Sequence, residues 1–96
     1  MKSDYQIFII TRLRKLREEH GYSQKDLAAF LGISNGQMGN IESPRAANKY
    51  TIKQIFLICS EFKYPIEQIF LENEDFEKRK DIISLLMTHI IRYGEK

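Results

Sequence analysis

The residues that could carry covalent, redox or metal chemistry are few in this sequence, and they lie far apart. A single cysteine, Cys59, excludes an internal disulfide, and neither His20 nor His89 has a second ligand at metal-site spacing. The acidic residues of segment 72–77 are typical of a solvated linker and helix start, not of a catalytic pair. No glycine-rich phosphate loop and no Ser/His/Asp or Cys/His set is present. We therefore expect no enzymatic activity, no catalytic residue, no metal and no cofactor.

Length and composition indicate one globular domain. The 96 residues have a mass of 11.4 kDa, with 43% hydrophobic and 29% charged residues. No apolar run approaches the roughly 18 residues that cross a membrane, and no signal-peptide cleavage site follows the short apolar run at 7–10. We expect a cytoplasmic protein without a membrane partner. Residues 1–50 carry eight Lys and Arg against five Asp and Glu, so a polyanion should meet this half.

The segments that could hold a functional side chain in place all have helical patterns. The first helix has an apolar face of Tyr5, Ile9, Leu13 and Leu16 and ends near Gly21. Three capping boxes predict the next helix starts, at Ser23–Asp26, Ser34–Gln37 and Thr51–Gln54. The second helix should stop at Gly32 and the third at Ser43-Pro44, before a polar loop from Arg45 to Tyr50.

Two further helices complete the predicted core. The helix after Thr51 should bury a face made of Ile52, Ile55, Phe56, Cys59 and Phe62. A fifth helix is expected to begin at Pro65, because proline suits the first helical position. Its inward residues are Ile66, Ile69 and Phe70.

The last stretch, from about Asp75 to Tyr93, is predicted as one helix with an unusually wide apolar surface. Its apolar side chains cover about 240° of the helical circumference, whereas about 100° is enough to dock on a small core. The surplus apolar surface needs a second partner, and self-association is the most economical explanation. The expected dimerisation residues are Ile82, Leu85, Leu86, Met87, Ile90 and Ile91.

The segment from Gln24 to Ile41 combines two short helices with a tight turn at Gly32. Ala28 lies where the two helices cross, and a small side chain is needed there because a larger one would push the helices apart. The apolar positions are Leu27, Leu31, Ile33, Met38 and Ile41. Together with Arg14-Lys15-Leu16-Arg17 and Gly21-Tyr22-Ser23, this pattern resembles the Cro/repressor (Xre-type) helix-turn-helix family from about Ile9 to Phe70. The resemblance implies an all-α, five-helix, lambda-repressor-like DNA-binding domain with an additional C-terminal helix.

In that family the second helix of the motif enters the DNA major groove, and the first crosses the backbone. The resemblance implies base contacts by Asn35, Gly36, Gln37 and Asn40, and Asn and Gln amides can pair with adenine. It implies phosphate contacts by Gln24, Lys25, Ser34, Arg45, Asn48 and Lys49. Arg17 and Glu42 match a structural ion pair that ties the first helix to the recognition helix.

The same amide side chains are also compatible with a solvated helix face, with Gln37 serving only as the capping partner of Ser34. The sequence also departs from the family pattern. The family usually has a glycine two residues after this glutamate, whereas here Glu42 is followed by Ser43-Pro44. Gly36 and Gly39 cost about 2 kcal/mol of helix propensity, and no Lys or Arg lies between Ser34 and Glu42. We expect modest affinity per monomer, which makes dimerisation more necessary.

These observations divide the chain into a helix-turn-helix DNA-binding domain, residues 1–72, and a C-terminal dimerising helix, residues 73–96. The expected function is sequence-specific binding of double-stranded DNA by a homodimer at a two-fold symmetric operator, most simply as a transcriptional repressor. The alternative is an antitoxin-like or regulatory module that holds a protein partner on the apolar C-terminal helix. A further alternative keeps the fold as a scaffold without DNA binding.

Overall fold

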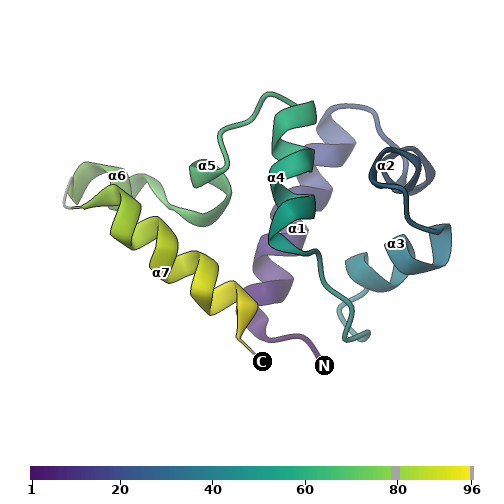
Figure 1. Ribbon diagram of the computed structural model, residues 1–96, viewed down its shortest axis with the longest axis horizontal. Helices are drawn as coiled ribbons and strands as arrows, with labels where there is room; N and C mark the ends of the chain where they lie inside the picture. The colour runs from purple at the N-terminus through teal and green to yellow at the C-terminus, as the bar shows by residue number, and fades with distance from the viewer. Residues whose placement is uncertain (79–80, 96) are drawn as a thin grey trace.

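The computed structural model describes residues 1–78 and 81–95, and its regular structure there is helical, as predicted. The elements are α1 (Asp4–Glu19), α2 (Gln24–Leu31), α3 (Asn35–Glu42), α4 (Ile52–Glu61), α5 (Glu67–Phe70), α6 (Asn73–Lys78) and α7 (Ile82–Gly94). Figure 1 shows α1 and α4 in the centre, with α2 and α3 on one side and α5 to α7 on the other. The molecule is flat, with principal extents of 40 × 29 × 18 Å.

The first four helices begin with the same local hydrogen bonds. In each, a hydroxyl side chain accepts the N–H of the residue three positions on, and that residue's side chain accepts the N–H of the capping residue. The pairs are Ser3–Gln6, Ser23–Asp26, Ser34–Gln37 and Thr51–Gln54. The three predicted boxes are confirmed, and the box at Ser3 is additional.

Helix α1 is the central element of the core, because it contacts α3 on one side and both α5 and α7 on the other. Its Ile9 and Leu13 are completely buried. The other side chains with no more than 1% exposure are Leu27, Ala28, Met38, Tyr50, Ile55, Ile58 and Tyr93. A single core therefore joins the helices of the motif to the last helix of the chain.

The predicted inner face of α4 is wrong at two positions. Ile52 is 37% exposed and Phe56 is 56% exposed, whereas Ile58 is completely buried. The buried face runs through Ile55, Ile58, Cys59 and Phe62. These positions follow the i, i+3, i+4, i+7 pattern, which puts Ile52 and Phe56 on one flank of the helix.

The prediction of one continuous helix from Asp75 to Tyr93 is also wrong, because this stretch forms α6 and α7. Asp81 has a non-helical backbone and starts α7 as its N-cap, with its carboxylate accepting the N–H of Ser84 at 3.1 Å. An aspartate that caps a helix in this way competes with continuation of the preceding one. Residues 79 and 80 of the predicted helix lie outside the described residues.

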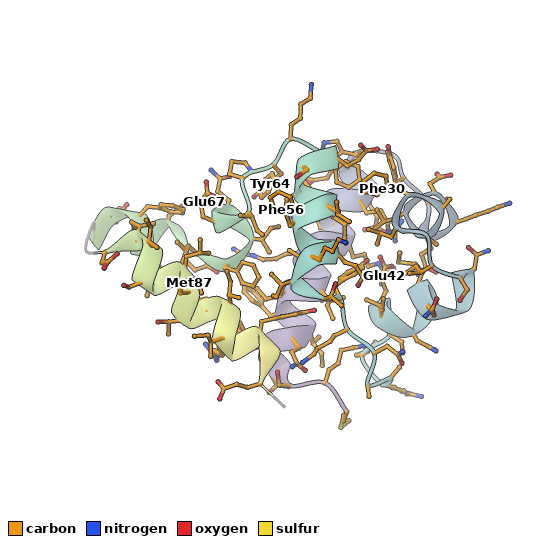
Figure 2. The ribbon with its side chains drawn as sticks, in the orientation of Figure 1. Phe30, Glu42, Phe56, Tyr64, Glu67 and Met87 are labelled. Atoms are coloured by element: carbon orange, nitrogen blue, oxygen red, sulfur yellow. The ribbon has the colours of Figure 1, made fainter. Side chains whose placement is uncertain are left out.

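Helix α7 has two apolar faces. Leu86, Ile90 and Tyr93 pack against the core, so two of the predicted dimerisation residues have intramolecular partners. Ile82 and Leu85 are half-buried. Ile83, Met87 and Ile91 are 73%, 48% and 60% exposed and form one ridge at i, i+4, i+8, which we call the α7 ridge; Met87 is labelled in Figure 2. The surplus apolar surface is therefore present, but Ile83 belongs to it and Leu86 and Ile90 do not.

Candidate nucleic-acid interface

Helices α2 and α3 are joined by a sharp turn that only a few backbone conformations allow. Gly32 ends α2 with φ +72°, in the left-handed region that glycine adopts without steric cost. The N–H of Ile33 then returns to the carbonyl of Ala28 at 3.0 Å, which satisfies a carbonyl at the end of α2. Ala28 is 1% exposed, so the predicted close packing at this position is present.

The outward face of α3 carries the four residues predicted to contact bases. Asn35, Gly36, Gln37 and Asn40 are all exposed, while Met38 faces the core and is completely buried. No hydrogen bond to another residue in the described part of the chain holds the side chain of Asn35 or Asn40. The side chain of Gln37 is held, because its oxygen accepts the N–H of Ser34 at 3.0 Å. The amide side chains of α3 are therefore exposed, as a base-contacting face requires, and Gln37 also serves as the capping partner of Ser34.

A buried ion pair fixes the C-terminal end of α3 to α1. The guanidinium of Arg17 donates from Nε and Nη2 to the two carboxylate oxygens of Glu42, each at 2.9 Å. A third donor, Nη1, binds the carbonyl of Tyr22 at 2.6 Å. The hydrogen bond with Glu42 raises the pKa of Arg17 above its usual value. Glu42 lies between α3 and the central helices in Figure 2.

Gln24 is attached to the same carboxylate. Its Nε2 donates to Oε1 of Glu42 at 2.9 Å, although the rest of the residue is exposed at the start of α2. An amide nitrogen has two N–H groups, so one remains for a further acceptor such as a phosphate oxygen. Gln24 therefore links the first turn of α2 to the end of α3.

Lys2 also contacts the end of α3, which the sequence did not predict. Its ammonium donates to the carbonyls of Asn40, Ile41 and Ser43. These bonds give the carbonyls at the C-terminal end of α3 a donor, and the positive charge complements the helix dipole. The residue is 6% exposed, and this burial lowers the pKa of its ammonium. The partners lie 38 to 41 residues away along the chain, so no local pattern could have indicated them.

Two tyrosines form a buried support beneath α3. The hydroxyl of Tyr50 donates to the sulfur of Met38 at 3.3 Å, and the hydroxyl of Tyr93 donates to the carbonyl of Tyr50 at 2.9 Å. Gln6 connects this support to α1, because its Nε2 donates to the carbonyls of Tyr93 and Glu95 at 2.8 and 2.6 Å. The end of α7 is thus hydrogen-bonded to the base of α3 through side chains.

The residues predicted to contact phosphates are in different situations. Lys25, Ser34, Arg45 and Asn48 are exposed around α2, α3 and the following loop. Lys49 lies elsewhere, because its ammonium approaches the carbonyls of Tyr93 and Gly94 at 3.5 and 3.3 Å, at the C-terminal end of α7. A cation at this position complements the helix dipole of α7. The structure thus leaves the first four residues exposed to solvent and attaches Lys49 to the end of α7.

A model of the helix-turn-helix family matches residues 13–69, which is more than half of the chain. The chain belongs to the Cro/C1-type helix-turn-helix family. No curated protein and no solved structure gives a significant match.

This helix-turn-helix protein is a DNA-binding transcription regulator in kind. The matched residues run from α1 into α5 and include the whole of α2 and α3. Helices α6 and α7 follow the matched segment, although Tyr93 of α7 lies in the same core. Helix α3 is therefore part of the family domain, while the supporting side chain of Tyr93 comes from outside the matched segment.

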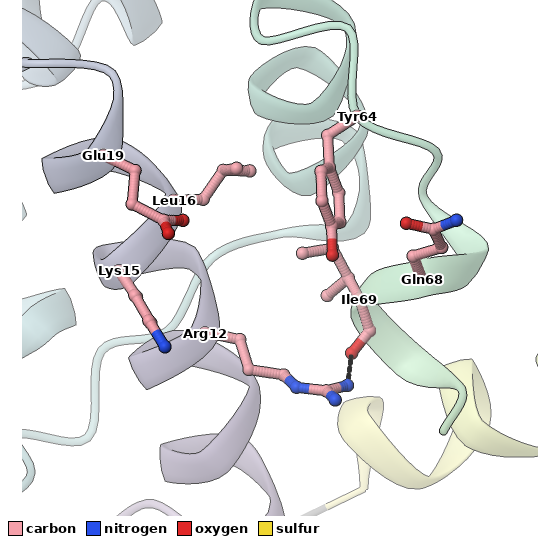
Figure 3. A pocket seen from close by; sticks show the side chains of 7 residues that line it. All are labelled: Arg12, Lys15, Leu16, Glu19, Tyr64, Gln68 and Ile69. Carbon is pink, nitrogen blue, oxygen red and sulfur yellow. Dashed lines mark hydrogen bonds between the residues drawn. The ribbon is translucent and has the colours of Figure 1, made fainter. Parts of the chain in front are cut away.

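A cavity of about 400 Å³ lies on the α5 side of α1, away from α3. Figure 3 shows Arg12 of α1 donating across it to the carbonyl of Ile69, at the end of α5. In the parts of the chain that the structure describes, no three His, Cys, Asp or Glu residues are grouped to hold a metal ion. Within those same residues, no helix is long and apolar enough to span a membrane.

Proposed function

We propose that the chain is a homodimeric transcriptional repressor that recognises a two-fold symmetric operator in double-stranded DNA. The observation that carries the proposal is the outward face of α3, where Asn35, Gln37 and Asn40 present amide groups to solvent. Amides read base edges in the major groove, and each good pair is worth about 1–3 kcal/mol of discrimination. Lys25, Ser34, Arg45 and Asn48, with the free N–H of Gln24, contact phosphates and set the register.

A second copy of the chain is the proposed occupant of the α7 ridge. Between Asp81 and Arg92, α7 has no Asp, Glu, Lys or Arg, so nothing charged opposes burial of this surface. Ile83 and Ile91 are equally spaced about Met87, and a two-fold antiparallel pair would therefore set Ile83 of one copy against Ile91 of the other. The same pairing brings the Asp81 end of one helix towards the Arg92 end of its partner.

The proposed function is tested by titrating the protein with labelled random-sequence duplex DNA and measuring fluorescence anisotropy at 50 and 200 mM salt. We expect binding at 50 mM that weakens at 200 mM, because phosphate contacts release counterions. Lys25→Ala should reduce the slope of log affinity against log salt by about 0.9. Lys15→Ala is the matched control, since it removes a charge from an exposed helical site on the α5 side of α1. Absence of binding at 50 mM salt would exclude the proposed function.

The glycines of α3 give a second prediction, because the fold does not require them. A Cβ added at Gly36 would meet only Ser34 Oγ, at 3.9 Å, and a Cβ at Gly39 would meet nothing within 4 Å. The double variant Gly36→Ala/Gly39→Ala should raise the free energy of unfolding by about 1–2 kcal/mol. It should also weaken DNA binding, because the added methyl groups stand where α3 approaches the bases.

Urea denaturation and anisotropy titration measure these two effects. Gly94→Ala is the control, since a Cβ there also meets nothing within 4 Å but lies at the end of α7. It should leave DNA affinity unchanged. If the double variant of α3 binds DNA as tightly as the wild type, close approach of DNA to this face is wrong.

A further inference from the structure

The capping box of α3 determines which atoms of Gln37 face outwards. The N–H of Ser34 donates to Oε1 of Gln37 at 3.0 Å, while the N–H of Gln37 donates to Oγ of Ser34 at 3.0 Å. A backbone N–H only donates, so the side-chain atom that faces it has to be the oxygen. The amide nitrogen of Gln37 therefore points away from the cap. On this exposed residue it offers two N–H donors to solvent.

Gln6 shows what a glutamine in this arrangement can bind. Its Oε1 accepts the N–H of Ser3 at 2.9 Å in the capping box of α1. Its Nε2 then donates both hydrogens, to the carbonyls of Tyr93 and Glu95. Gln37 has the same cap and the same free nitrogen, but its position on the outer face of α3 leaves room for acceptors from another molecule.

We infer that Gln37 selects guanine, by donating both N–H groups of Nε2 to the N7 and O6 atoms in the major groove. The inference rests on the proposed function, which brings α3 into that groove. Guanine presents two adjacent acceptors there, whereas adenine presents an acceptor beside a donor and cytosine presents a donor. Bidentate pairing with adenine also needs Oε1 as an acceptor, and the N–H of Ser34 already uses one of the two lone pairs of that atom. Pairing with guanine needs only the two N–H groups of Nε2.

The neighbours of Gln37 fit this assignment. Arginine and lysine are the commonest readers of guanine, and neither occurs between Ser34 and Glu42, so no cation on α3 competes for the base. Gly36 precedes Gln37 and has no side chain, and a Cβ added there would meet only Ser34 Oγ, at 3.9 Å. The unrestrained amides of Asn35 and Asn40 keep both a donor and an acceptor, and they remain suited to adenine.

The decisive variant is Gln37→Glu. A glutamate at this position keeps an oxygen for the N–H of Ser34 and suits the positive end of the helix, so the fold should be retained. It has no N–H to donate. Gln54→Glu is the matched control, because Gln54 occupies the same position of the capping box in α4. Thermal denaturation of both variants checks that the caps survive.

Selection from a random duplex library, followed by competition binding, measures the base preferences. We expect the wild type and Gln54→Glu to select a guanine in each half-site, and Gln37→Glu to lose about tenfold of the preference for it. Replacing that guanine by 7-deazaguanine removes N7 while keeping O6 and the base pairing. This change should weaken wild-type binding several-fold and leave Gln37→Glu unaffected.

The outcomes separate the inference from the proposed function. If the wild type selects a motif but Gln37→Glu keeps every guanine preference, or if the motif contains no guanine, the assignment of Gln37 is overturned while DNA recognition stands. If the wild type selects no motif at all, sequence-specific recognition is overturned, and the assignment of Gln37 with it.

Discussion

Replacing Glu42 by methionine should lower the free energy of unfolding by about 3–5 kcal/mol, because it leaves the buried guanidinium of Arg17 without its anion. Arg17 and Glu42 are 6% and 9% exposed, so water cannot readily replace the lost partner. The carboxylate also accepts the amide of Gln24. The variant therefore loosens the attachment of α3 to both α1 and α2. Urea denaturation followed by circular dichroism measures the loss.

Two further variants make this test specific. The double variant Arg17→Met/Glu42→Met removes both charges, and it should recover much of the lost stability because no unpaired ion remains. Glu18→Met is the control, since Glu18 forms an exposed pair with Arg14 at 3.6 Å, and such pairs are worth about 0.5 kcal/mol. The account fails if Glu42→Met is as mild as Glu18→Met, or if the double variant is less stable than Glu42→Met.

The second large effect is expected from Met87→Glu, at the centre of the α7 ridge. In the proposed antiparallel pair this substitution puts two carboxylates against each other at the two-fold axis, in a surface that has to lose its water. We expect the dimer to dissociate and the affinity for a two-fold operator to fall on the order of a hundredfold, because the two half-sites are no longer bound together. Affinity for a single half-site should stay the same.

Sedimentation and anisotropy titration follow these two quantities. Thr88→Glu is the matched control, because Thr88 is the next residue and is exposed on another face of α7. It adds the same charge and should remain dimeric. A wild-type chain that is monomeric at tens of micromolar would contradict self-pairing, and a different protein on the α7 ridge would then be the better explanation.

The parts of this fold that could be predicted from the sequence depend on contacts a few residues apart. The capping box of Ser34 and Gln37 spans three residues, and the turn at Gly32 is decided by its own backbone angle. Errors arose where several local patterns compete. The apolar positions of α4 fit two adjacent faces, and only packing in the common core decides that Ile58 is buried and Phe56 is not.

The candidate site was predictable to the same extent. The exposed face of α3 follows from a short periodic segment and from the family resemblance. The supports behind it do not, because Lys2 meets α3 and Lys49 meets α7 over 38 and more residues. In the sequence, each of these lysines looks like an ordinary exposed surface residue. Its partners are backbone carbonyls, which leave no mark in the sequence.

The tyrosine support beneath α3 has a consequence for biosynthesis. Tyr93 donates to the carbonyl of Tyr50, and Gln6 donates to the carbonyl of Tyr93 across 87 positions of the chain. A nascent chain that has emerged only as far as α5 has the whole helix-turn-helix motif but lacks the side chain that closes the core beneath it. Domains fold as units during translation, so we expect the packing beneath α3 to be completed only after Tyr93 has left the ribosome.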